Sequence, residues 1–183
     1  MAEAQPEPEF SRSILAERIG REEVERRIEA DAAERRALAR RLGLESLDGL
    51  KAELRLKRLS RGRIRLDGRF EAALTQLCVV SLEPVESRIE AEFSVEYTEG
   101  AAPEGPEAIV SIESAEPPEP IEGGVIDLGE AVVQQLAERI DPYPRAAGAE
   151  AKWPEPTSAS AEEQKKRPFA ALAALKKRKG KGE

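Results

Sequence analysis

The sequence predicts an α+β fold in which an antiparallel β-sheet packs against two helices. Three long segments between residues 50 and 97 alternate apolar and charged residues with period two. This alternation is typical of strands with one face on a core and the other in water. Residues 31–43 and 127–141 instead place apolar side chains at helical spacing behind an acidic residue that can act as an N-cap. The pattern leaves open whether the sheet closes partly into a barrel.

The N-terminal part of the chain predicts a disordered start, a short strand and the first helix. Residues 1–8 are rich in Ala, Glu and Pro, whereas residues 9–16, EFSRSILA, are typical of a short strand. Asp31 is followed three residues later by Glu34, which is the spacing of a capping box. Gly43 supplies the residue that commonly ends a helix.

The predicted sheet follows this helix. Residues 21–29 are charged and predict no clear element, but residues 50–57, 63–74 and 88–97 each alternate apolar with mostly polar residues. The polar positions are basic in the first two of these segments and acidic in the third. We therefore expect opposite charges on neighbouring strands to pair, each pair contributing about 0.2–1 kcal/mol.

The second helix is preceded by an acidic loop. Residues 99–124 are rich in Pro, Gly and Glu, and predict a loop with at most a short strand at 108–112. Asp127 then precedes a run with apolar residues at helical spacing, and Glu130 is placed to complete a second capping box. The pair Asp141–Pro142 is expected to stop this helix.

The composition limits the core and the available chemistry. Apolar residues make up 40% of the 183 residues and aromatic residues only 4%, so Leu, Ile, Val and Ala must fill the core. One cysteine and no histidine exclude an internal disulfide and a structural zinc site of Cys and His ligands. The usual general base near neutral pH is also absent. We interpret Cys78 as a small buried apolar residue rather than a reactive thiol, and we expect no metal, cofactor or small-molecule substrate.

The N-terminus and the hydropathy pattern predict a cytoplasmic protein without a membrane partner. The first ten residues carry acids and prolines where a secretory signal has basic and apolar regions. No apolar run approaches the roughly 18–20 residues that a membrane span requires.

Charge is distributed unevenly, which indicates charged partners. Residues 51–69 carry eight basic residues against two acidic ones, residues 83–141 carry sixteen acids against two bases, and residues 164–183 carry eight bases against one acid. The basic strand residues either contact RNA phosphates or form a polar face that neighbouring acids neutralise. The candidate phosphate contacts on the strands are Arg55, Lys57, Arg63 and Arg65.

The α+β domain is expected to cover residues 9–145. Residues 146–164 have the composition of a linker, and residues 165–183 form a basic tail interrupted by apolar residues. A helix in this tail places Phe169 and Leu172 on one side, but it is too short to be stable alone in water. It is therefore expected to fold on a partner, the alternative being a disordered solubilising tail. The candidate docking residues are Lys166, Arg167, Phe169, Leu172, Lys176 and Lys177.

Three motifs, in this order, resemble the bacterial YceD family, the large ribosomal RNA subunit accumulation proteins. They are CVVSLEPV after a long strand, EPIEGGVIDLGEAVVQQL at the second helix, and RPFAALAALK in the tail. The resemblance extends from about Phe10 to Lys177. Many members of this family carry Cys-x-x-Cys where this chain has Cys78 and Ser81, so a metal role of that motif is not expected here.

The resemblance implies a non-enzymatic factor in ribosome biogenesis. Such a factor would support the synthesis, processing or accumulation of large-subunit (23S) ribosomal RNA. Its expected partners are precursor large-subunit RNA, an early large-subunit ribosomal protein, or both. One alternative is a protein-binding adaptor that never touches RNA. Another is a metal-dependent nuclease, but carboxylates in a Pro-rich loop are a poor platform for fixed metal geometry.

Overall fold

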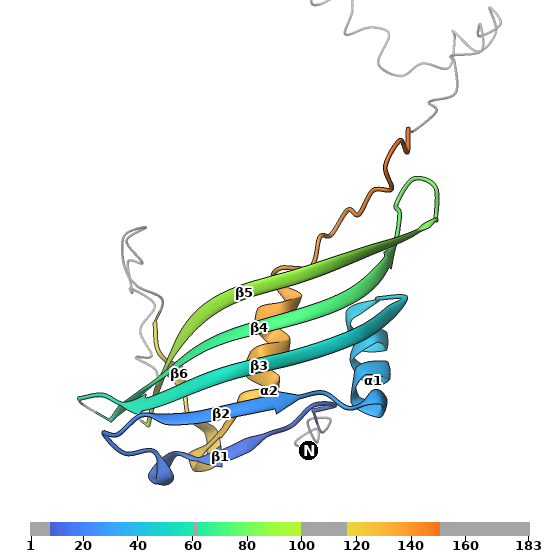
Figure 1. Cartoon of the computed structure of the whole chain (residues 1–183). Coiled ribbons are helices and arrows are strands. Elements are labelled where there is room, and N and C mark those ends of the chain that lie inside the picture. Colours follow the sequence, from blue (N-terminus) through green and yellow to red (C-terminus); the bar gives the residue numbers. More distant parts are fainter. Residues whose placement is uncertain (1–7, 61, 100–116, 151–183) are drawn as a thin grey trace, which may run out of the picture. The chain divides into compact units, whose positions relative to one another are not determined.

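The computed structural model describes residues 8–60, 62–99 and 117–150 (Figure 1). The described residues up to Ala149 belong to one compact unit, and a second unit starts at Glu150. The predicted strand at 108–112 and the predicted basic tail at 165–183 lie outside the described residues.

The main sheet has five strands in the order β2-β3-β4-β5-β6. All neighbours are antiparallel except β5 and β6, which are parallel. In the described part of the chain the sheet is open, with β2 and β6 at its edges, and does not close into a barrel. The strands are β2 (Val24–Glu29), β3 (Ser46–Arg58), β4 (Arg63–Leu77), β5 (Pro84–Thr98) and β6 (Glu119–Pro120).

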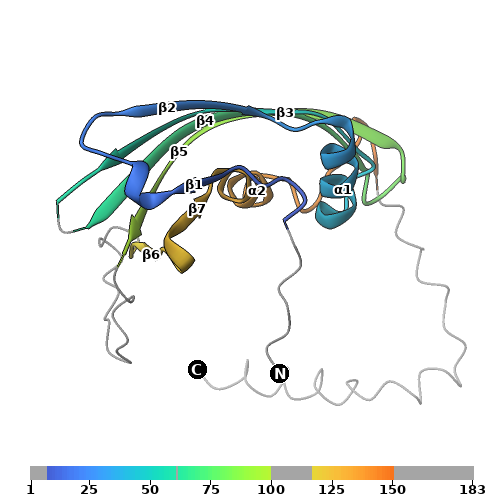
Figure 2. The ribbon, with the colours of Figure 1, turned by 90° about the horizontal axis from the view of Figure 1, so that it is seen from below.

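Two helices and a small second sheet complete the fold, as the α+β prediction requires. Helices α1 (Ala32–Leu42) and α2 (Leu128–Ala137) lie beneath the curved layer of β2–β5 (Figure 2). Strands β1 (Ser13–Leu15) and β7 (Val125–Asp127) pair in antiparallel fashion. Short 3₁₀ turns follow β1 at 16–18 and precede β7 at 122–124.

The first predicted helix terminus is confirmed in detail. The Asp31 carboxylate accepts from the N–H groups of Ala33 and Glu34, and the Glu34 carboxylate accepts from the Asp31 N–H at 2.7 Å. Gly43 ends α1 in the left-handed conformation, with φ of 67°. Local sequence therefore decides both ends of α1.

The second helix differs from the prediction at both ends. Asp127 caps α2 by accepting from the N–H groups of Gly129 and Glu130. The Glu130 carboxylate, expected to complete a capping box, is instead bound by Arg41 of α1 at 2.6 and 2.8 Å. Regular α-helix ends at Ala137, four residues before the predicted stop at Asp141. A contact between α1 and α2 thus takes the place of the predicted capping box.

Three further predictions need correction. The first strand covers only Ser13–Leu15 rather than residues 9–16, because Phe10 is buried in the core instead of extending the ladder. The charged stretch 21–29 contains β2, which pairs with β3. The predicted loop 99–124 contains β6, which is held by its pairing with the end of β5.

The core lies between the inner face of the sheet and α2. Gly68 of β4 leaves room for the Phe93 ring of β5, because a Cβ at position 68 would lie 2.4 Å from Phe93 Cζ. Phe93 in turn lies beside Phe70, with ring centroids 6.2 Å apart. The side chains buried to less than 2% exposure include Leu54, Leu56, Ile64, Leu66, Phe70, Leu74, Val132 and Leu136. The opposite face of β2–β5 carries the charged residues.

Candidate nucleic-acid interface

The outer face of the main sheet carries acidic and basic side chains in alternation across the strands. The register places Glu25 beside Arg55 and Arg55 beside Asp67. In the neighbouring row of outward-facing residues the order of the charges is reversed, and Arg27 of β2 lies beside Glu53 of β3. The row then continues through Arg69 and Glu92. This arrangement confirms the expectation that opposite charges on neighbouring strands pair.

Two of the candidate phosphate contacts share one carboxylate. Arg63 and Arg65 lie 2.9 and 2.6 Å from the carboxylate oxygens of Glu96 on β5. The hydrogen bond from Arg65 and the charge of Arg63 lower the pKa of Glu96, while Glu96 raises the pKa of Arg65. This carboxylate is therefore ionised at neutral pH, and a phosphate would have to compete with it for both guanidinium groups.

The other two candidates on the strands differ from each other. Arg55 lies 3.6 Å from Glu23 and 3.4 Å from Glu25. Lys57 is exposed, and no carboxylate in the described part of the chain forms an ion pair with it. The prediction that Arg55, Lys57, Arg63 and Arg65 contact phosphate stays a prediction, and three of the four are already neutralised by carboxylates.

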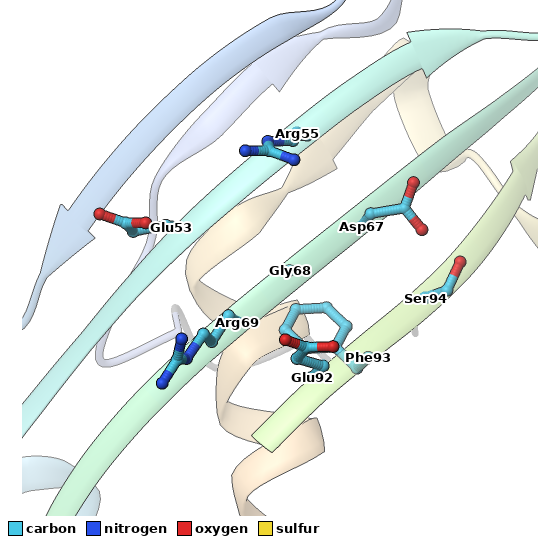
Figure 3. A pocket seen from close by; sticks show the side chains of 8 residues that line it. All are labelled: Glu53, Arg55, Asp67, Gly68, Arg69, Glu92, Phe93 and Ser94. Atoms are coloured by element: carbon cyan, nitrogen blue, oxygen red, sulfur yellow. The ribbon is translucent and has the colours of Figure 1, made fainter. Parts of the chain in front are cut away.

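A shallow hollow of about 610 Å³ opens on the outer face around Gly68. Figure 3 shows Arg55 of β3, Asp67 and Arg69 of β4, and Glu92 of β5 around it, with carboxylates and guanidinium groups interleaved. Because neither sign of charge dominates, this hollow does not concentrate the positive potential that a phosphate backbone requires.

Helix α1, like Lys57 on the sheet, carries basic residues that no carboxylate in the described ranges pairs with. Arg36 and Arg40 are exposed and lie one helical turn apart. In the described ranges, neither of them forms an ion pair. Together with Ala33 they line a shallow hollow on the solvent side of the helix. Like charges at this spacing destabilise a helix by about 0.2–0.5 kcal/mol, although Arg40 lies in the last turn of α1, where a cation interacts favourably with the helix dipole.

Packing fixes the direction in which these arginines point. Leu38 is fully buried and Ala39 is 7% exposed, so this side of α1 packs on the core. Arg41 also turns toward the protein, where it binds Glu9 and Glu130. Arg36 and Arg40 therefore remain on the solvent side. Of their side-chain nitrogens, only Arg36 Nε forms a hydrogen bond within the described ranges, which it donates to the Ala32 carbonyl at 3.1 Å.

Sequence reasoning missed this basic helix face. The run ERRALARR was used to predict a helix, but its arginines were not considered as phosphate contacts. The spacing of Arg36 and Arg40 was a usable signal, since residues four apart share a face. What the sequence could not show is that Arg41, next to Arg40, has carboxylate partners.

Cys78 is buried, as expected, at the turn between β4 and β5. Its sulfur accepts from the N–H groups of Val80 and Ser81, both at 3.4 Å. Hydrogen bonds from Ser81, together with the Ala146 N–H, lower the pKa of the thiol to about 6. No group of three or more potential metal-ligating side chains occurs among the residues described.

No helix in the described ranges is long and apolar enough to cross a membrane.

Comparison with curated proteins and with solved structures finds no match. A family comparison matches residues 66–176 to the family described as "Large ribosomal RNA subunit accumulation protein YceD". This match covers more than half of the chain and confirms the resemblance drawn from the three motifs, although it begins at residue 66 and not at Phe10. The chain therefore belongs to the YceD family, whose name implies a role in the accumulation of large-subunit ribosomal RNA.

Proposed function

We propose that this protein is a non-enzymatic cytoplasmic factor that supports large-subunit ribosomal RNA accumulation by binding precursor RNA directly. Its principal phosphate contacts are Arg36 and Arg40 on α1. The observation that carries this proposal is that both side chains are exposed and that no carboxylate in residues 8–60, 62–99 or 117–150 forms an ion pair with them. The family description names large-subunit ribosomal RNA as the molecule concerned. Helix α1 offers two cationic side chains that can bind the phosphate backbone of this RNA.

The electrostatic comparison favours α1 over the two sheet arginines that share Glu96. A phosphate that binds Arg63 or Arg65 must displace Glu96, and the released carboxylate then repels the RNA. A phosphate that binds Arg36 or Arg40 displaces only water and counterions. No aromatic side chain accompanies these arginines on α1. Recognition there consequently depends on backbone and shape rather than on base stacking.

The salt dependence of RNA binding tests this site. The full chain is titrated against a labelled fragment of precursor large-subunit RNA, with fluorescence anisotropy as the readout, over a series of salt concentrations. The double variant Arg36→Gln, Arg40→Gln is compared with the matched control Arg55→Gln, Arg65→Gln, which removes the same charge from ion-paired positions. The first should lower the slope of log K against log salt by about 1.4–1.8, and the control should leave the slope nearly unchanged. The reverse result would place the contact on the sheet.

The proposal contains no catalytic step. The competing hypothesis of a metal-dependent nuclease is tested by incubating the same RNA with the full chain and Mg²⁺ or Mn²⁺. Cleavage that disappears with a chelator would overturn the non-enzymatic part. The predicted tail contacts are tested by truncation after residue 163, because loss of RNA affinity in that variant would add the tail to the binding site.

The adaptor hypothesis differs from RNA binding in its response to salt. Phosphate contacts weaken steeply as salt rises, whereas docking of apolar side chains such as Phe169 and Leu172 does not. Co-purification with large-subunit proteins that survives both ribonuclease and high salt, without measurable RNA binding, would favour the adaptor.

A further inference from the structure

An exposed apolar patch lies at the turn between β4 and β5. Four of the five large apolar side chains that are exposed in the described ranges gather there. The turn supplies Leu77, Val79 and Leu82, which are 45%, 47% and 71% exposed. The segment after α2 supplies Tyr143, which is 72% exposed. We call this surface the hairpin tip, formed by residues 77–84 and 141–144. Such a grouping is typical of an interaction surface rather than of scattered exposed side chains.

Hydrogen bonds hold the two parts of the hairpin tip together. The Val79 N–H donates to the Pro144 carbonyl at 2.9 Å, and the Gln76 side-chain amide donates to the Asp141 carbonyl at 2.8 Å. Within the turn, the Cys78 N–H donates to the Glu83 carbonyl at 2.8 Å. The patch is therefore formed before any partner arrives, which reduces the entropy lost on binding.

The backbone of Leu82 adds a second observation. Its φ is +60°, and it is the one residue other than glycine with a positive φ in the described ranges. This conformation is unfavourable for leucine, and here it accompanies a side chain that projects into solvent rather than into the core. Strain of this kind concentrates where structure serves binding.

The charges around the patch identify the occupant. Residues 76–87 and 140–146 contain Glu83, Glu86 and Asp141 against one basic residue, Arg145, so this surface carries a net negative charge. We propose that the hairpin tip binds a segment of a basic protein that presents apolar side chains flanked by Lys or Arg. RNA and anionic membranes are disfavoured because these carboxylates repel phosphate, and a second identical tip would bring like charges together.

This partner is separate from the RNA contact on α1. The choice of large-subunit ribosomal proteins as the probe rests on the proposed function. The titration of the Arg36 and Arg40 variants described above does not involve the hairpin tip, so failure of one proposal is distinguishable from failure of the other.

Photo-crosslinking tests the hairpin tip directly. In the full chain, Tyr143 is replaced by the photoreactive benzoylphenylalanine, which is also aromatic. The probe is total protein extracted free of RNA from purified large ribosomal subunits, and the crosslinked peptide is identified by mass spectrometry. The control carries the same photoreactive residue at Ser94, which is exposed on the outer face of β5.

We expect a crosslink to one or a few peptides with apolar residues flanked by Lys or Arg, absent from the Ser94 control. A crosslink to this chain itself, whether to its own basic tail or to a second copy, would overturn the proposal. A crosslink to acidic peptides would also overturn it, as would a yield no higher than in the control. Ribosomal RNA is also added to the mixture as a competitor of the ribosomal proteins. A crosslink from the hairpin tip to RNA would likewise overturn the proposal.

A substitution that preserves the fold separates binding from stability. Leu82→Gly removes the apolar side chain and accepts the positive φ without strain, so the melting temperature should stay equal or rise. The crosslink yield should fall at least about fivefold. Leu15→Ala, at the exposed apolar side chain outside the hairpin tip, should leave the yield unchanged. Unchanged yield in Leu82→Gly would contradict the proposal.

Discussion

Replacement of Gly68 by alanine should destabilise the domain strongly, although alanine is the smallest possible addition. Gly68 faces the inner side of β4, opposite Phe93 on β5 and Leu54 on β3. A Cβ at this position would lie 2.4 Å from Phe93 Cζ and 2.8 Å from Leu54 Cδ2. Carbon atoms in contact prefer about 3.5–4.0 Å, so the ring must move by about 1 Å or more.

The magnitude follows from what the ring would lose. Overpacking of a filled core costs about 1–3 kcal/mol. Displacement of Phe93 also disturbs its contact with Phe70, and such aromatic pairs contribute about 0.5–1.5 kcal/mol. Alanine regains roughly 0.5–1 kcal/mol of backbone entropy in a strand. These ranges combine to a net loss of roughly 0.5–4 kcal/mol, centred near 2 kcal/mol, in the free energy of unfolding.

Urea unfolding followed by circular dichroism measures this loss, with Gly49→Ala as the matched control. A Cβ at position 49 meets no atom within 4 Å, so this substitution in β3 should change stability by about 0.5 kcal/mol or less. Phe93→Leu should partly rescue Gly68→Ala, with a coupling of about 1 kcal/mol or more in the double-mutant cycle. Equal stabilities of the two alanine variants, or strict additivity of the cycle, would refute this description of the core.

Three further predictions concern a cap, a thiol and an ion pair. Asp127→Ala should cost about 1–2 kcal/mol of unfolding free energy in urea denaturation, because its carboxylate caps α2 and also accepts from the Ser11 hydroxyl and the Arg12 N–H. Asp127→Asn keeps an acceptor oxygen for the cap and should cost less, and equal costs would contradict the capping role. Because the folded pKa of Cys78 is lowered to about 6, the stability that its thiolate contributes should be complete above the unfolded pKa near 8.5 and be lost as pH falls through 6. Thiolate absorbance at 240 nm should titrate near pH 6 in the folded protein, and a midpoint at or above 8 would contradict this. Glu96→Gln should strengthen RNA binding at low salt in the anisotropy assay, because it frees Arg63 and Arg65 from their shared carboxylate. An unchanged affinity would contradict the view that Glu96 is what keeps these two arginines from phosphate.

Elements encoded by local pattern were predictable from the sequence. The alternation of apolar and charged residues places β3, β4 and β5, and the spacing of Asp31 and Glu34 places the start of α1. Both signals depend on residues close together in the chain. The opposite charges of the outer face also pair as the strand pattern indicates.

Features that depend on distant contacts were not predictable. Strand β2 lacks clean alternation because Arg26, which pairs with buried Leu54, is exposed near the sheet edge. Glu130 fits a capping box in sequence, but the fold brings Arg41 to it from another helix. The ion pairing of the candidate phosphate contacts was not predictable for the same reason. Sequence shows where arginines lie, whereas only the register shows that Arg63 and Arg65 share Glu96.

Sedimentation of cell lysates on sucrose gradients at low and moderate salt tests the central claim most directly. It compares the full chain, the variant Arg36→Gln, Arg40→Gln, and the control variant Arg55→Gln, Arg65→Gln. We expect the full chain and the control to travel with large-subunit precursors, while the α1 variant stays at the top of the gradient. Co-sedimentation of the α1 variant together with loss of the control from the precursor fractions would contradict the claim that α1 holds the RNA.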